Sequence, residues 1–247
     1  MIKSTIDQLN KETAKLNLSE TLKFFYSLYG NKIIIGSSMS MEDQIILNEA
    51  IRISKDFNIF TIDTGRLPQE TYDLINETNQ KYGIRIKIYF PNHKDVEYMI
   101  NKYGPNLFYE SIEKRKLCCE IRKVKPLKRA LKDYKAWCTG LRKEQSLTRK
   151  NIKKVEWDEN NNVLKINPFI EWTIDDIWNY VKKENILINK LHYNNYPSIG
   201  CAPCTRPIKE GEDIRAGRWW WENNEQKECG IHIKDEKIIR LKEDNCS

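Results

Sequence analysis

The chain has 247 residues, of which 40% are hydrophobic. This suits one α/β domain with a modest extension and excludes wholesale disorder. The net charge of +7 favours an anionic partner such as a nucleotide, a nucleic acid or an acidic protein. No apolar stretch has signal-peptide or membrane-spanning length, so we expect a cytoplasmic protein without a membrane partner.

Helices and strands alternate through the first part of the chain. Apolar spacing predicts two helices in residues 1–30, with Ser19 as the N-cap of the second. The next elements are predicted as strands at 32–36, 59–62, 84–89 and 135–139 and helices at 42–53, 68–82, 95–103 and from the cysteines at 118–119 to 131. The strand at 84–89 alternates apolar and charged residues, which indicates a sheet edge.

The later elements complete an α/β pattern. Residues 155–157 and 163–166 form a predicted hairpin. Thr173 begins a helix that runs to 183, and its predicted core face consists of Ile174, Ile177, Trp178 and Val181. Such alternation predicts a mostly parallel sheet covered by helices on both faces. Ligands of these sheets lie at the carboxyl ends of the strands, where polar turns occur at 36–43, 63–66 and 139–145.

Four of the seven cysteines form two close pairs, Cys118-Cys119 and Cys201-x-x-Cys204. In a reducing compartment they indicate a metal, cluster or redox site, because a disulfide framework is not expected there. An adjacent pair is awkward for tetrahedral zinc. The same pair can reach two irons of a [4Fe–4S] cube, so the spacing favours a cluster over a Cys₄ zinc site or two unrelated buried pairs. Cationic side chains surround the first pair: Lys114, Arg115, Lys116, Arg122, Lys123 and Lys125.

Anion-binding and nucleophilic candidates lie elsewhere in the chain. The small-residue turn at 36–40 joins a strand to a helix and has no Walker lysine, so by itself it is a weak phosphate signal. Candidate oxyanion clamps are Arg142, Lys143, Arg206, Arg215 and Arg218. Cys229, beside Lys227 and His232, resembles an activated nucleophile, with an inert terminal cysteine as the alternative. The tryptophans at 219–221 favour packing over base stacking.

Five blocks of the sequence together resemble the adenylyl-sulfate and phosphoadenylyl-sulfate reductase family. They are residues 62–67 with 70–72, 139–146, 196–206, 211–213 with 215–221, and 227–232. The resemblance implies an adenine-nucleotide hydrolase-like or PP-loop ATPase-like fold. It implies a [4Fe–4S] cluster on Cys118, Cys119, Cys201 and Cys204, and a preference for adenylyl sulfate.

The resemblance also implies a mechanism. Cys229 would attack the sulfonyl sulfur, release AMP and hold a Cys S-sulfonate, from which a separate thioredoxin would release sulfite. The substrate would contact Ser37, Ser38, Ile62, Gly140, Lys123, Arg215, Arg218 and His232. The enzyme would serve sulfate assimilation and cysteine biosynthesis. Its partners would include no nucleic acid, and a homo-oligomer is compatible with the sequence.

Three parts of the chain follow from this interpretation: N-terminal helices at 1–30, a nucleotide- and cluster-binding domain at 31–218, and a mobile C-terminal segment at 219–247. One departure concerns the turn before the helix at 42–53, where Ser40 replaces the family's usual glycine. The alternatives are a reductase of 3′-phosphoadenylyl sulfate, a zinc-stabilised nucleic-acid-binding module, and a nucleotide-binding regulator with a structural cluster.

Overall fold

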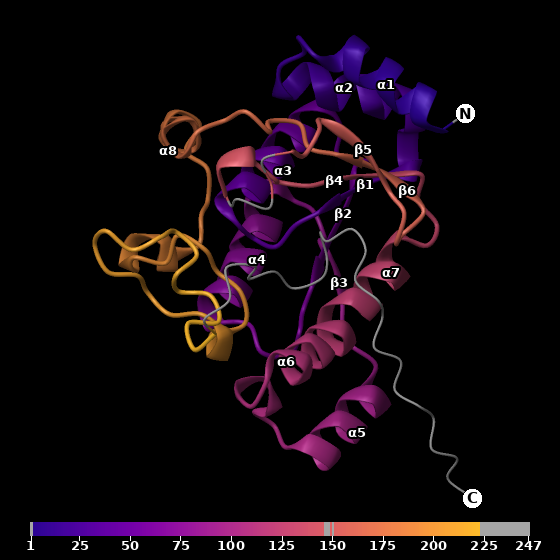
Figure 1. Ribbon diagram of the computed structural model, residues 1–247. Coiled ribbons are helices and arrows are strands. Elements are labelled where there is room, and N and C mark those ends of the chain that lie inside the picture. The colour runs from indigo at the N-terminus through magenta and orange to yellow at the C-terminus, as the bar shows by residue number, and fades with distance from the viewer. Residues whose placement is uncertain (1, 146–148, 150, 223–247) are drawn as a thin grey trace, which may run out of the picture.

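The computed structural model describes residues 2–145, 149 and 151–222. Six strands form one sheet in the order β3-β2-β1-β4-β6-β5 (Figure 1). Their bounds are β1 (Ile33–Gly36), β2 (Asn58–Ile62), β3 (Lys87–Tyr89), β4 (Ala136–Cys138), β5 (Val155–Asp158) and β6 (Val163–Ile166). All neighbouring pairs are parallel except the β5–β6 hairpin. The predicted mostly parallel sheet, its hairpin and the edge position of β3 are confirmed.

The central strands are apolar because both of their faces are covered. Ile33, Ile34 and Ile35 of β1 have no exposed surface, and Cys138 of β4 is equally buried. Continuous β-branched runs of this kind are typical of parallel strands between two helical layers. The expected core position of Cys138 is therefore confirmed.

Eight α-helices accompany the sheet in the described part of the chain. They are α1 (Ile2–Thr13), α2 (Leu18–Tyr29), α3 (Met41–Ile53), α4 (Gln69–Tyr82), α5 (His93–Tyr103), α6 (Ile112–Cys119), α7 (Lys125–Leu131) and α8 (Ile174–Lys183). Side chains of α1, α2, α3, α4 and α8 share one core cluster, and α7 packs on the opposite face of the sheet. Figure 1 shows α1 and α2 at one end of the molecule and α5 and α6 at the other. Within the described residues no helix is long and apolar enough to cross a bilayer.

Three boundaries differ from those that the sequence predicted. Helix α2 is capped by Asn17 in a capping box with Glu20, so Ser19 already lies inside the helix. Strand β3 begins at Lys87 because the Asn79 side chain accepts the Ile86 N–H at 2.9 Å, and a strand would need that donor. The helix that carries the cysteines begins before them, at Ile112, because the Ser111 side chain accepts the Lys114 N–H.

Helix α8 confirms most of its predicted face. Thr173 and Asp176 form a capping box, and Ile177 and Val181 are buried. Ile174 is 36% exposed, so the prediction that it faces the core was wrong. As the first helical residue it lies at the margin of the contact surface, where its N–H donates to Glu144 at 2.8 Å.

Candidate active site at the carboxyl edge of the sheet

The two cysteine pairs come together in the structure. Cys118 and Cys119 end α6, and Cys201 directly precedes the short 3₁₀ turn Ala202–Cys204, which Cys204 ends. All four belong to one apolar cluster that also contains Phe108 and Trp219. This cluster joins side chains more than 80 positions apart, so only the tertiary fold forms it.

The loop after β2 links the two pairs. Thr64 Oγ1 lies 3.1 Å from Cys201 Sγ, and the Thr64 carbonyl accepts from Arg122 Nη1 at 2.7 Å. The Arg66 carbonyl accepts the Ala202 N–H at 2.8 Å. The cysteine site is therefore attached to the carboxyl end of a central strand, where ligands of parallel sheets usually lie.

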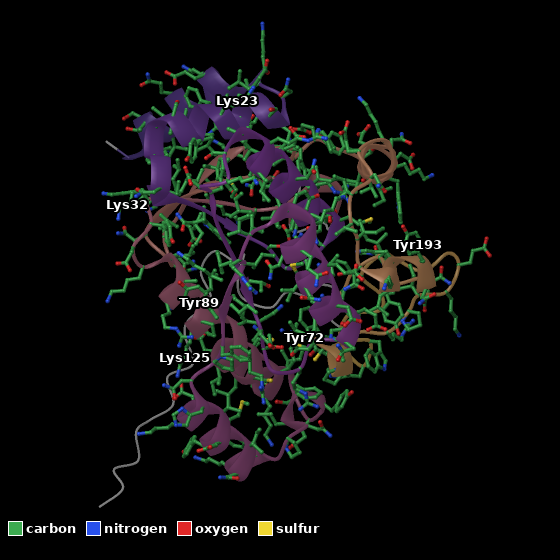
Figure 2. All side chains as sticks on the ribbon, turned by 180° about the vertical axis from the view of Figure 1, so that it is seen from behind. Lys23, Lys32, Tyr72, Tyr89, Lys125 and Tyr193 are labelled. Atoms are coloured by element: carbon green, nitrogen blue, oxygen red, sulfur yellow. The ribbon has the colours of Figure 1, made fainter. Side chains whose placement is uncertain are left out.

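Asp63 shapes the same loop from inside. Its Oδ1 accepts the Gly65 N–H at 2.7 Å and the Tyr72 hydroxyl at 2.9 Å. Burial, the bond to Asp63 and the nearby Cys201 raise the pKa of Tyr72 to about 12. Figure 2 shows Tyr72 on α4 beside sulfur atoms. Asp63 thus holds both the turn and the tyrosine that borders the cysteines.

A wide helical turn follows Cys119 directly. Residues Glu120–Val124 form a π-helix between α6 and α7, and such turns are frequent at functional sites. Arg122 is buried in it and is close enough to Cys118 to lower the pKa of that thiol. Lys123 has the same effect on the pKa of Cys204. The extra residue in this turn places two successive cations near both cysteine pairs.

Burial disfavours the charged form of these thiols. It raises the pKa of Cys118, and it raises that of Cys204 to about 12, against the opposing effects of Arg122 on the first and Arg218 and Lys123 on the second. Iron–sulfur clusters bind thiolates. The four cysteines and the cations beside them therefore fit an iron–sulfur cluster, whose binding would favour the thiolate form. Among the described residues no three His, Cys, Asp or Glu side chains are placed to hold a single metal ion.

Arg218 lies close to Cys204 and against the Trp219 ring. Its side chain is buried, and its Nε has no hydrogen-bond partner among the described residues. A Cβ on Gly200 would clash with the guanidinium, so the Arg218 side chain can pack in this position only because residue 200 is glycine. Arg215, also expected to contact substrate, is half-buried three residues earlier, and its N–H donates to Asp213 at 2.8 Å.

The predicted phosphate turn binds an internal carboxylate. The Ser38 N–H and hydroxyl each donate to Asp43 Oδ2 at 2.6 Å, and Ser37 is buried beside them. Ser40 has φ −74° and ψ 167° and caps α3, whereas the left-handed residue is Met39 with φ 62°. Serine in place of glycine at position 40 therefore requires no unusual backbone.

Asp43 is expected to cost stability at neutral pH. Burial raises the pKa of Asp43 in spite of the Ser38 hydrogen bonds, so the folded chain binds more protons than the unfolded chain above about pH 4. Stability is then lost as pH rises through the raised pKa. Asp43→Asn, whose oxygen can accept the same bonds, is expected to raise the Tm at pH 7 by a few degrees, at roughly 2–4 °C per kcal/mol.

Thermal unfolding between pH 5 and 8 checks this, with Asp176→Asn as the matched control. Hydrogen bonds from the Thr173 backbone and hydroxyl lower the pKa of Asp176. Its contribution is therefore present at neutral pH and lost only as pH falls through the lowered pKa. The control is expected to lower the Tm at pH 7. A lower Tm for Asp43→Asn with an unchanged pH slope would contradict the argument.

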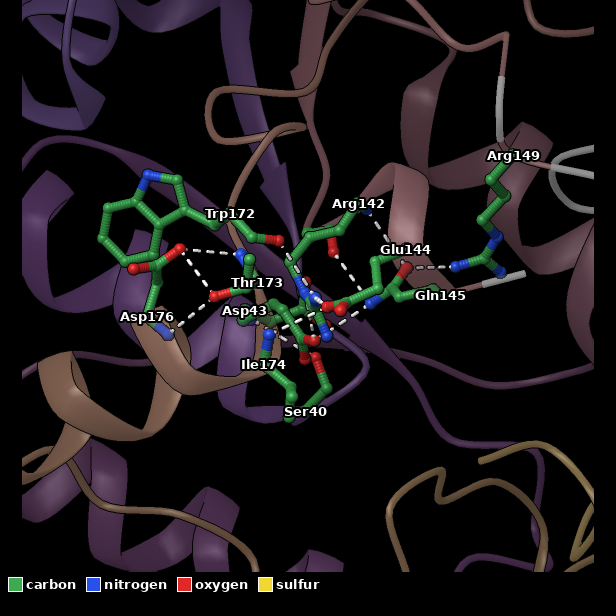
Figure 3. Close-up of polar contacts among 12 residues, drawn as sticks. Ser40, Asp43, Arg142, Glu144, Gln145, Arg149, Trp172, Thr173, Ile174 and Asp176 are labelled. Atoms are coloured by element: carbon green, nitrogen blue, oxygen red, sulfur yellow. Dashed lines mark hydrogen bonds and ion pairs between the residues drawn. The ribbon is translucent and has the colours of Figure 1, made fainter. Parts of the chain in front are cut away.

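Arg142 has a structural task in the described part of the chain (Figure 3). It is buried, its Nε donates to Glu42 at 3.0 Å, and its Nη1 donates to Glu144 at 2.8 Å and to the Trp172 carbonyl at 3.0 Å. Gln145 also donates to Glu42, at 3.0 Å. Three internal acceptors thus engage Nε and Nη1 of Arg142, and its role as a candidate oxyanion clamp stays a prediction.

The remaining predicted contacts surround the same edge. Ile62 ends β2. Gly140 follows β4 and is packed so closely that an added Cβ would lie 2.6 Å from Asp43 Oδ1.

Cys229 and His232 lie outside the described residues. Sequence reasoning overlooked Thr64 and Asp43, although the Asp-Thr-Gly turn after a predicted strand was a usable signal for the first. The substrate contacts as a set stay a prediction.

Comparison with known proteins agrees with this geometry. Residues 32–207 match the phosphoadenosine phosphosulfate reductase domain family. A protein of Allochromatium vinosum named adenosine 5′-phosphosulfate reductase is 47% identical over 206 residues, covering 83% of this chain and 80% of the relative. A protein of the same name from Agrobacterium fabrum is 45% identical over 225 residues, covering 91% and 86%.

Solved structures give the same fold. The phosphoadenylyl-sulfate reductase of Candida auris, in a phosphate complex, matches with a TM-score of 0.70 and 27% identity, covering 81% of this chain and 96% of that one. The FMN adenylyltransferase of Candida glabrata, with ATP, matches with a TM-score of 0.56 at 14% identity, covering 84% and 68%, and supports the fold alone. The predicted PP-loop type of fold is thereby confirmed. The family model matches well over half of the chain, and the chain belongs to the phosphoadenosine phosphosulfate reductase family.

Proposed function

We propose that this protein is an oxidoreductase that converts adenylyl sulfate to sulfite and AMP. The observation that carries the proposal is the meeting of both cysteine pairs with Lys123 and Arg218 at the carboxyl edge of the sheet. Relatives named adenosine 5′-phosphosulfate reductase, 47% and 45% identical to this chain, support adenylyl sulfate as the substrate.

The first chemical step forms one bond and breaks another. The Cys229 thiolate attacks the sulfonyl sulfur, the S–O bond to the phosphate breaks, and AMP leaves with the electron pair of that bond. Cys229 then carries an S-sulfonate. A mononucleotide phosphate is a good leaving group, particularly when cations hold its developing charge.

The described residues would hold the nucleotide in place for this step. Lys123, Arg215 and Arg218 supply the cations for the phosphosulfate, whose charges require several donors of fixed direction. Ser37 and Ser38 would contribute hydrogen-bond donors in the turn before α3. A bound anion would displace the Asp43 carboxylate from the Ser38 N–H and hydroxyl. Ile62 and Gly140 line the adenosine side, and His232 would join from the C-terminal segment.

Cys118, Cys119, Cys201 and Cys204 would hold a [4Fe–4S] cluster. When bound, the cluster supplies a fixed charge distribution beside the substrate and a rigid link between α6 and the 201–204 turn. Arg115 and Arg122 lie against the cysteines and offset the charge of their thiolates. Lys123, which is close enough to Cys204 to lower the pKa of its thiol, would lie between this site and the substrate.

A separate dithiol protein of the thioredoxin class would complete the cycle. One of its thiolates attacks Cys229 Sγ, sulfite leaves, and a mixed disulfide forms. Its second thiol then releases the Cys229 thiol, so the dithiol supplies both electrons. We place the reaction in the cytoplasm, where such dithiols are kept reduced.

Intact-protein mass spectrometry tests the proposal without a reductant. Holoprotein is incubated in parallel with adenylyl sulfate and with 3′-phosphoadenylyl sulfate, and the adduct is mapped by proteolysis. We expect a sulfonate on Cys229, faster with adenylyl sulfate, that reduced thioredoxin removes. A faster adduct with the 3′-phosphorylated nucleotide would favour the alternative substrate. No adduct with either one would sink the covalent scheme.

Elemental analysis separates the enzyme from the non-enzymatic alternative. Iron and acid-labile sulfide in anaerobically purified protein are expected at about four of each per chain. Zinc without iron would favour a zinc-stabilised nucleic-acid-binding module, which the charge of +7 first suggested.

A further inference from the structure

A buried ion pair joins α6 to the end of the described chain. Arg115 Nε lies 2.9 Å from Glu222 Oε1, and Arg115 Nη2 lies 3.0 Å from Glu222 Oε2. The two side chains are only 1% and 3% exposed. This two-bond contact spans 107 positions of sequence and is the arrangement in which arginine binds a carboxylate most directionally.

Trp219 completes the contact between the two segments. Its ring lies 4.5 Å from the Arg115 guanidinium and 4.8 Å from that of Arg218. It is buried and has φ 44°, a left-handed backbone that is strained for a bulky residue. A strained backbone conformation persists only where the surrounding contacts hold it in place. The packing around Trp219 therefore stabilises a backbone conformation at position 219 that is unfavourable by itself.

The ion pair is poorly explained by stability alone. A buried ion pair is often no more stabilising than well-packed apolar residues of the same volume, since both charges lose their hydration. Buried ionic contacts are better attested as devices that select one geometry. The geometry selected here is the position of residues 219–222 relative to the cysteine helix.

Both partners lie close in sequence to residues of the proposed reaction. Arg115 precedes Cys118 by three positions and hydrogen-bonds with Cys119. Glu222 precedes Cys229 by seven positions, so the extended chain between them spans at most about 25 Å. Fixing Glu222 therefore limits the Cys229 thiol to positions within about that distance of Glu222.

We propose that Arg115, Trp219 and Glu222 form an anchor that fixes the starting point of the segment carrying Cys229. This inference rests on the proposed function, in which Cys229 attacks the sulfonyl sulfur. The three are positioning residues: they raise the effective concentration of the thiolate at the substrate, because a fixed residue 222 restricts where a thiol seven positions later can lie. The anchor contributes to the rate of sulfonyl transfer and leaves nucleotide affinity to the residues at the sheet edge.

Glu222→Gln is the first test, since it keeps the shape and removes the charge. At saturating adenylyl sulfate we expect the single-turnover rate of S-sulfonate formation to fall at least about tenfold. The dissociation constant of AMP is expected to stay within about twofold of the wild type, with unchanged iron and sulfide content. Glu222→Asp keeps the charge on a shorter side chain, so its rate should lie between those of Glu222→Gln and the wild type.

Glu212→Gln is the matched control in the same segment. Glu212 also pairs with an arginine through two bonds, to Arg206 at 2.8 and 2.9 Å, but its side chain is 30% exposed. Exposed pairs contribute little, so its adduct rate should equal that of the wild type.

Two results would overturn the anchor. Wild-type rates in both Glu222 variants would show that the pair does not position Cys229. A slower rate accompanied by a parallel loss of iron or of AMP affinity would show a general structural role. Failure of the proposed function is separate from both, because in that case the wild-type protein itself forms no adduct.

Discussion

A Cys229→Ser variant is expected to lose sulfite production by at least about 10³-fold while it keeps its iron and its affinity for AMP. A hydroxyl at this position is a far weaker nucleophile than a thiolate, and covalent catalysis depends on that atom. Removal of one member of a catalytic unit commonly costs several orders of magnitude. Sulfite release with adenylyl sulfate and reduced thioredoxin measures the loss.

Cys246→Ser provides the control for that experiment. It is the same substitution in the same C-terminal segment, at a cysteine that we interpret as inert, and full activity is expected. Substantial sulfite formation by Cys229→Ser would place the nucleophile elsewhere. Loss of iron in that variant would instead mean that Cys229 also supports the cluster, which contradicts the division of roles proposed above.

The second large effect is expected for Cys204→Ser. Cys204 is buried in the apolar cluster with the other three cysteines. A hydroxyl does not replace a thiolate ligand of iron, so iron and sulfide content should fall roughly tenfold after anaerobic purification. The visible absorbance of the cluster should fall with them. Because the cysteines fix the 201–204 turn near Arg218, activity should be lost as well.

Cys138→Ser separates loss of a ligand from loss of a buried thiol. Cys138 is fully buried in β4, and burial raises its pKa to about 12. Its replacement buries a hydroxyl in an apolar core and is expected to cost about 1–3 kcal/mol of stability. Iron content should remain that of the wild type. Equal iron loss in the two variants would mean that the cluster responds to general destabilisation.

Much of the local structure follows from local rules. The apolar run at 33–35 predicts a strand buried on both faces, and Thr173 predicts a helix start because its side chain can accept an N–H of the first turn. Boundaries were missed where side chains compete for backbone donors, as Asn79 does at Ile86. Such competition depends on a neighbour in space, and apolar periodicity carries no information about it.

The sequence by itself determined the element order, the two cysteine pairs and the family motifs. Only the tertiary structure decided which partners the charges have: Arg142 pairs with Glu42 and Glu144, whereas Arg218 lies beside Cys204 with a free Nε within the described residues. It also decided that Arg115 holds Glu222. The physical reason is that strand order and helix packing bring these partners together from distant parts of the chain, and once the charges are buried each needs a partner to offset the hydration it has lost.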